Sequence, residues 1–311
     1  MTLARHETVL AFLTILALAT LAYLSDKFFT AGNLLNQGRL MSEVGLVALA
    51  MTFVIVTGGI DLSVGSILGL TAILFGVFWK NIGLPLPFAA VAAIGCGTLA
   101  GLANGLIITR FRVPPLIATL GTLALFRGLA EGISEARSVR GYPEWFFFLG
   151  QGEILGVPVQ LWLLGIATVI AAVILGLTPF GRAVYATGAN ETAARFSGIR
   201  VDAVKLWIYS AAGFLSALAA IVFVSRVTTT RSDMGTGLEL DVITGVVLGG
   251  TSIFGGKGTI IGTALGLILI QALKNGLALS GVKGDGTIVV IGVVLIVAIL
   301  ASALIDKNKG G

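Results

Sequence analysis

The chain has 311 residues, of which 56% are hydrophobic and only 11% are charged, and its formal net charge is +5. A soluble domain is about 25% charged, so this composition argues against a soluble protein, and apolar runs of about 20 residues predict an all-α polytopic membrane protein. One cysteine and one histidine leave no residues for a disulfide, a cysteine metal cluster or Ser-His catalysis. Basic residues scattered over short loops indicate membrane orientation rather than nucleic-acid binding.

Ten apolar segments are expected to be transmembrane helices of one membrane domain, residues 1–311. They cover residues 8–24, 42–57, 62–79, 87–109, 114–131, 161–177, 206–224, 240–254, 258–279 and 287–303. The first is interpreted as a retained span, because the Leu-Ser-Asp-Lys that follows it is a poor signal-peptide cleavage site. The second and eighth are short for a complete span.

Both short segments run into glycine pairs. Gly58-Gly59 is followed by Asp61, and the second region carries Gly249-Gly250 and Gly255-Gly256. In a bilayer such a helix break is tolerated only where it is buried in protein or lines a cavity. Paired breaks in the two halves of a chain predict an inverted-repeat transporter. The alternative is that Gly-rich membrane segments resemble one another by composition alone.

Loop charges predict the orientation. With ten spans both termini lie on one side, and the Lys and Arg residues of loops 110–113 and 178–205 favour the cytoplasm for that side. The connection 132–160 then faces the periplasm, where Trp145, Phe146 and Phe147 beside charged residues indicate an interfacial segment.

The cytoplasmic connection contains a short helix with capping signals at both ends. Asn190 is the N-cap candidate, Glu191 lies at the positive end of the helix dipole, and Gly198 is the stop. Glu191 and Arg195 have the i, i+4 spacing of an ion pair. A solvated linker helix would carry the same signals.

Asp61 has two interpretations. It is either the N-cap of a helix that begins at Leu62, accepting from the Ser63 or Val64 N–H, or a pathway carboxylate that contacts substrate or couples protons. Neutral polar residues inside apolar spans are likewise either hydrogen-bond contacts between helices or pathway-lining groups. They are Asn104, Thr119, Thr122, Gln271 and Asn275.

Residues 250–258 resemble a phosphate-binding loop but fail its pattern. Thr251 stands where the first glycine belongs, and Gly258 stands where a Ser or Thr should bind magnesium. The sequence therefore predicts no enzyme and no bound cofactor, and any ATP hydrolysis belongs to another chain.

Four stretches resemble the ribose-type permeases of ATP-binding-cassette (ABC) sugar importers. Residues 56–66 read Val-Thr-Gly-Gly-Ile-Asp-Leu-Ser-Val-Gly-Ser, the hallmark of that family, and 114–122, 181–199 and 248–258 match its later segments in the same order. The resemblance implies a bacterial inner-membrane subunit that works with a second permease, two ATPase subunits holding ATP and magnesium, and a periplasmic sugar-binding protein. Its cargo would be a pentose, hexose, deoxysugar such as rhamnose, or autoinducer-2.

The resemblance also implies roles for particular residues. The helix near Asn190 would dock on the ATPase, and outer basic residues would meet the binding protein. The ATPase-coupling set is Asn190, Glu191, Ala194, Arg195 and Gly198; the pathway or helix-break set is Gly58, Gly59, Asp61, Ser63, Asn104, Thr119, Thr122, Gln271 and Asn275; the docking set is Arg137, Arg140, Arg231 and Lys283. Residues 231–235 resemble the autoinducer-2 and rhamnose branch, in which two different permeases often pair.

Two other classes remain. An ion-coupled secondary transporter would use Asp61 as its coupling site, and the presence of a partner ATPase discriminates against it. A membrane scaffold or receptor has no need of paired helix breaks.

Overall fold

The computed structural model describes residues 26–135 and 137–282 continuously, together with 11, 14, 15, 18, 19, 23, 284, 286–293 and 296. The long helices are α2 (Ala31–Val56), α3 (Val64–Lys80), α4 (Leu86–Arg110), α5 (Pro115–Ser134), α7 (Val159–Leu177), α10 (Val201–Val227) and α12 (Ile260–Leu279). The short ones are α6 (Glu144–Gln151), α8 (Pro179–Ala189), α9 (Glu191–Phe196) and α11 (Leu238–Leu248). Two-residue strands pair antiparallel, β1 (Val139–Arg140) with β4 (Thr229–Thr230) and β2 (Glu153–Ile154) with β3 (Val157–Pro158).

The helical membrane class is confirmed. Within the described residues, 6 helices are long and apolar enough to cross a membrane, namely α2, α4, α5, α7, α10 and α12, and α3 is a shorter apolar helix. Of the ten predicted segments, 8–24 falls largely outside the described residues, and 287–303 is described only in part. The eighth is short, as predicted, because α11 has 11 residues.

The prediction that the second segment is short is wrong. Helix α2 begins at Ala31 and has 26 residues, well before the apolar run at 42. Its first turns carry polar side chains that bond to other parts of the chain. Gln37 accepts from Gln271 of α12 at 2.6 Å, and Arg39 pairs with Glu153 at 2.6 Å. The helix starts at its N-cap Thr30, whose hydroxyl oxygen accepts from the Asn33 N–H, and partners distant in sequence satisfy the polar side chains that precede its apolar stretch.

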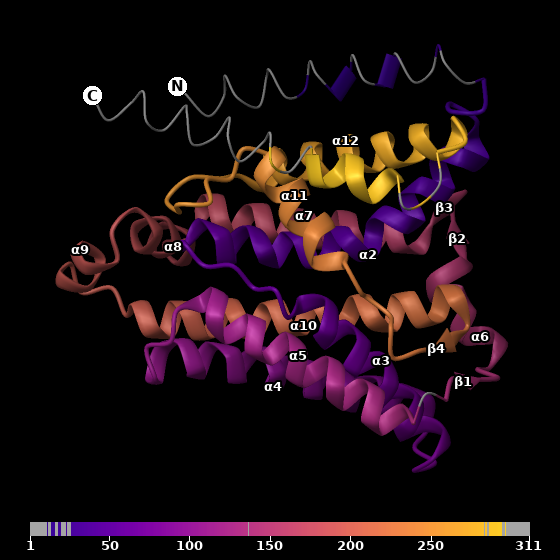
Figure 1. The fold of residues 1–311 in the computed structure, drawn as a ribbon, viewed down its shortest axis with the longest axis horizontal. Helices are drawn as coiled ribbons and strands as arrows, with labels where there is room; N and C mark the ends of the chain where they lie inside the picture. The colour runs from indigo at the N-terminus through magenta and orange to yellow at the C-terminus, as the bar shows by residue number, and fades with distance from the viewer. Residues whose placement is uncertain are drawn as a thin grey trace.

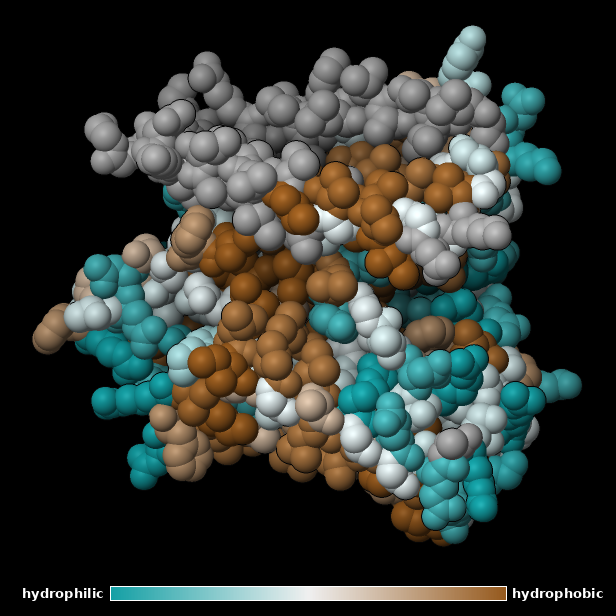
Figure 2. All heavy atoms as spheres, viewed as in Figure 1, coloured by the Kyte–Doolittle hydropathy of each residue, from teal (hydrophilic) through white to brown (hydrophobic). Residues whose placement is uncertain are grey.

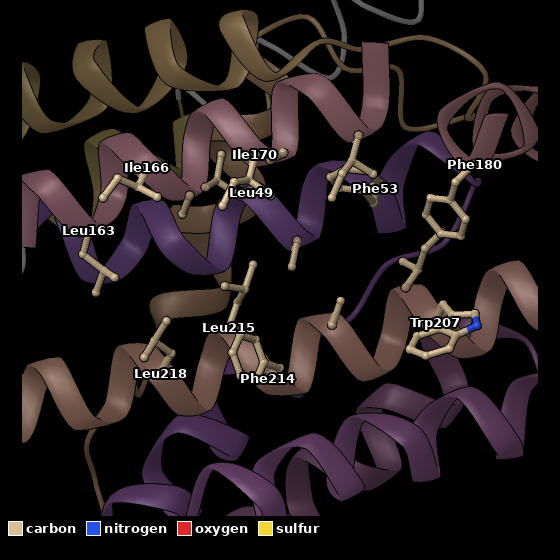
Figure 3. Close-up of a pocket in the computed structure, with 16 residues that line it drawn as sticks. Leu49, Phe53, Leu163, Ile166, Ile170, Phe180, Trp207, Phe214, Leu215 and Leu218 are labelled. Atoms are coloured by element: carbon tan, nitrogen blue, oxygen red, sulfur yellow. The ribbon is translucent and has the colours of Figure 1, made fainter. Parts of the chain in front are cut away.

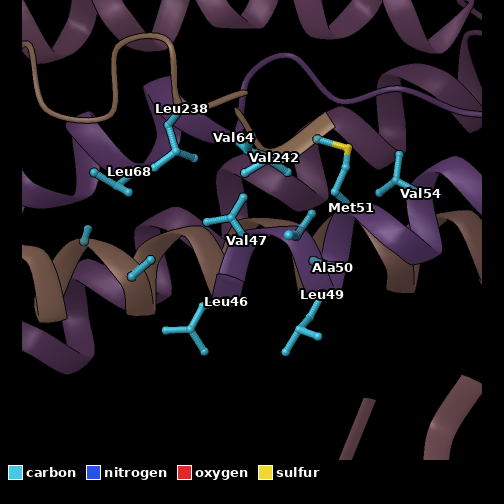
Figure 4. Close-up of a cluster of buried hydrophobic side chains, with 14 of the residues drawn as sticks. Leu46, Val47, Leu49, Ala50, Met51, Val54, Val64, Leu68, Leu238 and Val242 are labelled. Carbon is cyan, nitrogen blue, oxygen red and sulfur yellow. The ribbon is translucent and has the colours of Figure 1, made fainter. Parts of the chain in front are cut away.

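The core lies between two layers of helices that run along the long axis of the molecule (Figure 1). Helices α2, α7, α11 and α12 form one layer, and α3, α4, α5 and α10 form the other. In the centre, Val47 and Met51 of α2 meet Val64 of α3 and Val242 of α11, all fully buried (Figure 4). Hydrophobic residues gather across the middle of the visible face, and hydrophilic ones gather toward its two ends (Figure 2), as expected for a bundle that crosses a membrane lengthwise.

Glycines bring α4 and α10 into backbone contact. A Cβ on Gly101 would lie 2.2 Å from the Tyr209 carbonyl oxygen, and one on Gly213 would lie 2.3 Å from the Gly97 carbonyl oxygen. Membrane helices pack closely through such small residues, because lipid provides no hydrophobic drive between helices. This contact fixes Tyr209 beside the polar groups described below.

The connection 132–160 packs some of its aromatic side chains into the core. Tyr142 stacks on Trp79 with ring centroids 4.4 Å apart, and Phe146 is buried beside Phe75 at 5.4 Å. Trp145 remains exposed. Helix α6 therefore turns Phe146 inward against α3 and leaves Trp145 outside, and the interfacial position of this segment stays a prediction.

Candidate functional site

The first Gly-rich segment begins where α2 ends. Gly58 has a φ of +78°, and the Gly59 N–H donates to the Val54 carbonyl at 3.0 Å while the Gly58 N–H donates to Ile55 at 2.8 Å. This bonding pattern is the Schellman stop, in which a glycine takes the left-handed conformation that other residues avoid. The chain stays out of helix until α3 begins at Val64.

Asp61 lies fully buried in this segment. Its Oδ1 accepts hydrogen bonds from the Ser63 N–H at 2.9 Å and the Ser63 hydroxyl at 2.7 Å. Asn104 of α4 in turn donates to the Ser63 hydroxyl oxygen at 2.7 Å. The predicted bond from Ser63 is present, but Asp61 is not the N-cap of a helix starting at Leu62. The chain turns at Leu62, and Ser63 becomes the N-cap residue.

Three polar atoms around Asp61 lack a protein partner among the described residues. They are Asp61 Oδ2, Asn104 Oδ1 and Tyr209 Oη, all in fully buried side chains. Gly59 gives the tyrosine room, since a Cβ there would lie 2.6 Å from the hydroxyl oxygen. Unpaired buried polar atoms are costly, and three of them here surround one carboxylate, so this polar cluster of Asp61, Ser63, Asn104 and Tyr209 is the candidate site.

Sequence reasoning did not identify Tyr209. An aromatic residue in an apolar run gives no signal that its hydroxyl group faces a carboxylate in the segment between α2 and α3. Thr119 of α5 completes the wall of the cluster by donating to the Ile60 carbonyl oxygen at 3.1 Å. Thr122 bonds only to Thr119 in its own helix, at 3.3 Å.

Gln271 and Asn275 lie apart from this cluster. Both are on α12 and face the first turns of α2, where Gln271 donates to Gln37. The side-chain amides of Asn275 and Asn33 each donate a hydrogen bond to the other, at 2.9 and 3.0 Å. These bonds join two helices. The predicted pathway set therefore divides into a cluster near Asp61 and an amide ladder between α2 and α12.

The second Gly-rich segment, 249–259, contacts the first. The Gly256 N–H donates to the Val56 carbonyl oxygen at 2.8 Å. A Cβ on Gly255 would lie 3.0 Å from the Gly58 nitrogen and 2.8 Å from the carbonyl oxygen of Gly188, at the end of α8. The two regions that the sequence identified separately are thus in direct backbone contact.

Helix α9 follows α8 directly and has the predicted caps. Asn190 Oδ1 accepts from the Ala193 N–H at 2.9 Å, and Gly198, with a φ of +83°, ends the helix. Ala194 is buried beneath the helix, while Phe196 is 89% exposed. Sequence reasoning overlooked Phe196, although an aromatic residue in a charged loop was a usable signal.

Four charged side chains fix α9 to the first turns of α10. Arg195 contacts Glu191 at 2.9 Å and Asp202 at 2.5 Å, and Lys205 contacts Glu191 at 2.6 Å. Partial burial raises the pKa of Glu191, but the hydrogen bonds from Lys205 and Arg195 outweigh it and hold the pKa below its usual value. This ion cluster borders a polar groove of about 760 Å³ between α9 and the α4–α5 link.

The described basic residues that were predicted to meet a binding protein lie at the end of the bundle opposite α9 (Figure 1). The β1–β4 pairing sets Arg140 opposite Thr229 and so brings it near Arg231. Arg137 is exposed and lies 3.7 Å from Glu135, and Arg231 pairs with Asp233. Lys283 lies outside the described residues.

A pocket of about 340 Å³ between α2, α7 and α10 has an apolar lining (Figure 3). Leu49, Ile170 and Phe214 are among the side chains that point into it. Such a lining offers a polar solute almost no hydrogen bonds, so this pocket suits lipid or another apolar group rather than a polyol.

Comparisons with known proteins agree on one family. The family model described as "Branched-chain amino acid transport system / permease component" matches residues 33–299. The chain is 43% identical over 288 residues to "Ribose import permease protein RbsC" of Bacillus subtilis (strain 168), covering 92% of this chain and 88% of the relative. It is 40% identical to the protein of the same name from Escherichia coli (strain K12), covering 99% and 95%. It is 35% identical to "Autoinducer 2 import system permease protein LsrD" of Escherichia coli (strain K12 / DH10B), covering 96% and 92%. No solved structure matches the chain significantly.

Proposed function

This chain belongs to the family of ribose-type permeases of ABC sugar importers, and we propose that it carries a monosaccharide or a related small polyol of the ribose, rhamnose or autoinducer-2 type across the membrane. Its multi-pass apolar bundle and the substrates in the names of its relatives support this cargo class. A periplasmic binding protein delivers the sugar, and separate ATPase subunits hydrolyse ATP with magnesium, so the chain itself needs no cofactor.

The finer architecture is part of the proposal. Ten spans in one domain, with segments 8–24 and 287–303 as the first and last, put both termini in the cytoplasm of a bacterial inner membrane. Loop 178–205 is then cytoplasmic, loop 132–160 is periplasmic, and the two Gly-rich segments belong to an inverted repeat. A second permease subunit, identical or related, completes the pathway.

The observation that carries the coupling role is the exposed end of α9. Phe196 contacts little of its own chain, although it is a large apolar side chain in a charged loop. Interface anchors are commonly aromatic residues that fill a partner's pocket. The ion cluster around Arg195 holds α9 against α10 and so fixes the position from which Phe196 projects. We therefore assign α9 as the ATPase-docking helix with Phe196 as its anchor.

Arg195 contributes to coupling by positioning α9 in this proposal. It is engaged by Glu191 and Asp202 within the chain, so its charge is already compensated before any partner binds. Exposed pairs of this kind contribute about 0–1 kcal/mol. Their role here is to hold α9 in position.

The docking role is tested by Phe196→Ser in the tagged chain expressed with its ATPase. We expect unchanged membrane levels, about tenfold lower ATPase recovery, as for loss of an interface anchor, and little sugar uptake. The matched control is Leu155→Ser, which removes an apolar side chain that is 90% exposed at the opposite end. Equal ATPase recovery from the two variants would refute the docking role. Absence of any ATPase with the wild-type chain would refute the importer assignment.

On the outer face, Arg137, Arg140 and Arg231 are the proposed contacts for acidic residues of the binding protein. Their clustering near the β1–β4 pairing supports this assignment. Rim charges of this kind mainly change the association rate and its salt dependence. Lys283, proposed for the same role, lies outside the described residues.

A further inference from the structure

Helix α8 ends against both Gly-rich segments at one residue, Gly188. A Cβ at this position would lie 1.7 Å from the Val56 carbonyl oxygen and 2.6 Å from the Gly256 nitrogen. Those two atoms are themselves joined by the 2.8 Å hydrogen bond between the segments. Three backbones therefore meet with no side chain between them.

A second contact holds α8 to the same loop. One turn before Gly188, the Tyr185 hydroxyl group donates to the Gly258 carbonyl oxygen at 2.6 Å. Helix α8 thus touches the second Gly-rich segment at two points. Only Asn190 separates α8 from α9, so a displacement of α9 acts directly on this end of α8.

The contact is stiff because it is made by backbones. Side chains can change rotamer and absorb a small shift, whereas a close-packed interior transmits it. From Val56 the chain leads through Gly58 and Gly59 to the buried Asp61 cluster. From Gly256 it leads to the start of α12.

We propose that Gly188 is the positioning residue that transmits movement of α9 to both Gly-rich segments at once. The end of α2 and the α11–α12 loop then move as one unit when the ATPase closes. This inference rests on the proposed function. It adds the residue through which the docking helix reaches the polar cluster and assigns no new substrate.

The first test is Gly188→Ala in the assembled complex in proteoliposomes, with sugar uptake, ATP hydrolysis and ATPase recovery measured together. We expect normal ATPase recovery, continued ATP hydrolysis and about tenfold lower uptake, within the range over which coupling residues act. Tyr185→Phe should lower sugar uptake by about twofold while ATP hydrolysis continues. The matched control is Gly176→Ala in α7, where a Cβ meets nothing within 4 Å.

Uptake by Gly188→Ala equal to that of the control, or loss of ATPase recovery in step with uptake, would overturn the transmission role. Failure of the proposed function is distinguishable, because the wild-type chain would then recover no ATPase. If Gly188→Ala does not fold, a cysteine pair replaces it.

The cysteine pair is Ala189→Cys with Gly256→Cys in a Cys96→Ala background. A Cβ on Gly256 would lie 3.4 Å from that of Ala189, near the usual disulfide spacing of about 3.8 Å. If α8 and the second Gly-rich segment stay in contact throughout the transport cycle, a disulfide between them does not hinder transport. The oxidised and reduced complexes should therefore take up sugar equally. Uptake that stops on oxidation and returns on reduction would overturn the proposal.

Discussion

Both Gly-rich segments start with the same helix stop and then take different courses. After α2 the left-handed glycine is Gly58, and after α11 it is Gly250, where the Thr251 N–H returns to the Val246 carbonyl oxygen. The first segment then runs from the end of α2 to the middle of the bundle (Figure 1). The second closes on itself through the bond from the Ser252 N–H to the Lys257 carbonyl oxygen at 3.0 Å.

This difference shows that similar glycines have different uses. In the first segment they free the chain to bury a carboxylate and to leave room for the Tyr209 hydroxyl group. In the second they bring two helices together, since a Cβ on Gly249 would lie 2.4 Å from the Gly262 carbonyl oxygen. Similarity of sequence between the two segments therefore does not imply that they form equivalent sites.

The largest effect is expected at Asp61, which only the first segment possesses. Asp61→Leu leaves the Ser63 N–H and hydroxyl group without their acceptor. Each buried unsatisfied donor costs about 1–3 kcal/mol, so the variant should lose about 2–6 kcal/mol of stability. Asp61→Asn keeps an acceptor oxygen and should lose about 1 kcal/mol or less. Thermal unfolding of the purified chain in detergent, followed by fluorescence, measures both.

Uptake by the two Asp61 variants separates the two interpretations of this residue. A structural carboxylate predicts that Asp61→Asn retains most of the transport. An Asn variant that is expressed normally and is as inactive as Leu would show that the charge itself is needed, and would refute a purely structural role for Asp61.

A smaller effect is expected at Gly262 of α12, which packs against Gly249 of the second segment. A Cβ there would lie 2.1 Å from the Gly249 carbonyl oxygen. Backbone atoms must move to admit it, and overpacking of this kind costs about 1–3 kcal/mol. We expect Gly262→Ala to lower the unfolding temperature while Gly165→Ala on α7, which meets nothing within 4 Å, does not. Equal unfolding temperatures would mean that the α11–α12 contact is looser than described.

Local features of both regions could be predicted from the sequence. The caps of α9 at Asn190 and Gly198, and the bond from Ser63 to Asp61, join residues at most a few positions apart. Such patterns depend on backbone chemistry that a short stretch of sequence already specifies. Apolar runs likewise predicted where most of the long helices lie.

Contacts between distant residues could not be predicted in this way. The start of α2 at Ala31 has a local signal in its N-cap Thr30, which accepts from the Asn33 N–H, but the bond from Gln271 of α12 to Gln37 has none. The hydroxyl group of Tyr209 reaches the Asp61 cluster only because glycines let α4 and α10 approach. The meeting of Gly188 with Val56 depends on how three helices are arranged. No local pattern carries that information.

The smallest effect is expected where the flanking helices of the two segments are joined. Thr52 of α2 and Thr263 of α12 share a hydrogen bond of 2.8 Å between buried hydroxyl groups, and Thr52 also donates to the Ala48 carbonyl oxygen. Hydrogen bonds between membrane helices contribute about 0.6 kcal/mol on average in double-mutant cycles. A cycle of Thr52→Val, Thr263→Val and the double variant should therefore give a coupling near that value in unfolding experiments. Because valine keeps the shape of threonine, packing is largely preserved, and the coupling reports the bond itself. A coupling indistinguishable from zero would show that this bond adds nothing to the contact between α2 and α12, which would then depend on the Gln271–Gln37 and Asn275–Asn33 bonds and on packing.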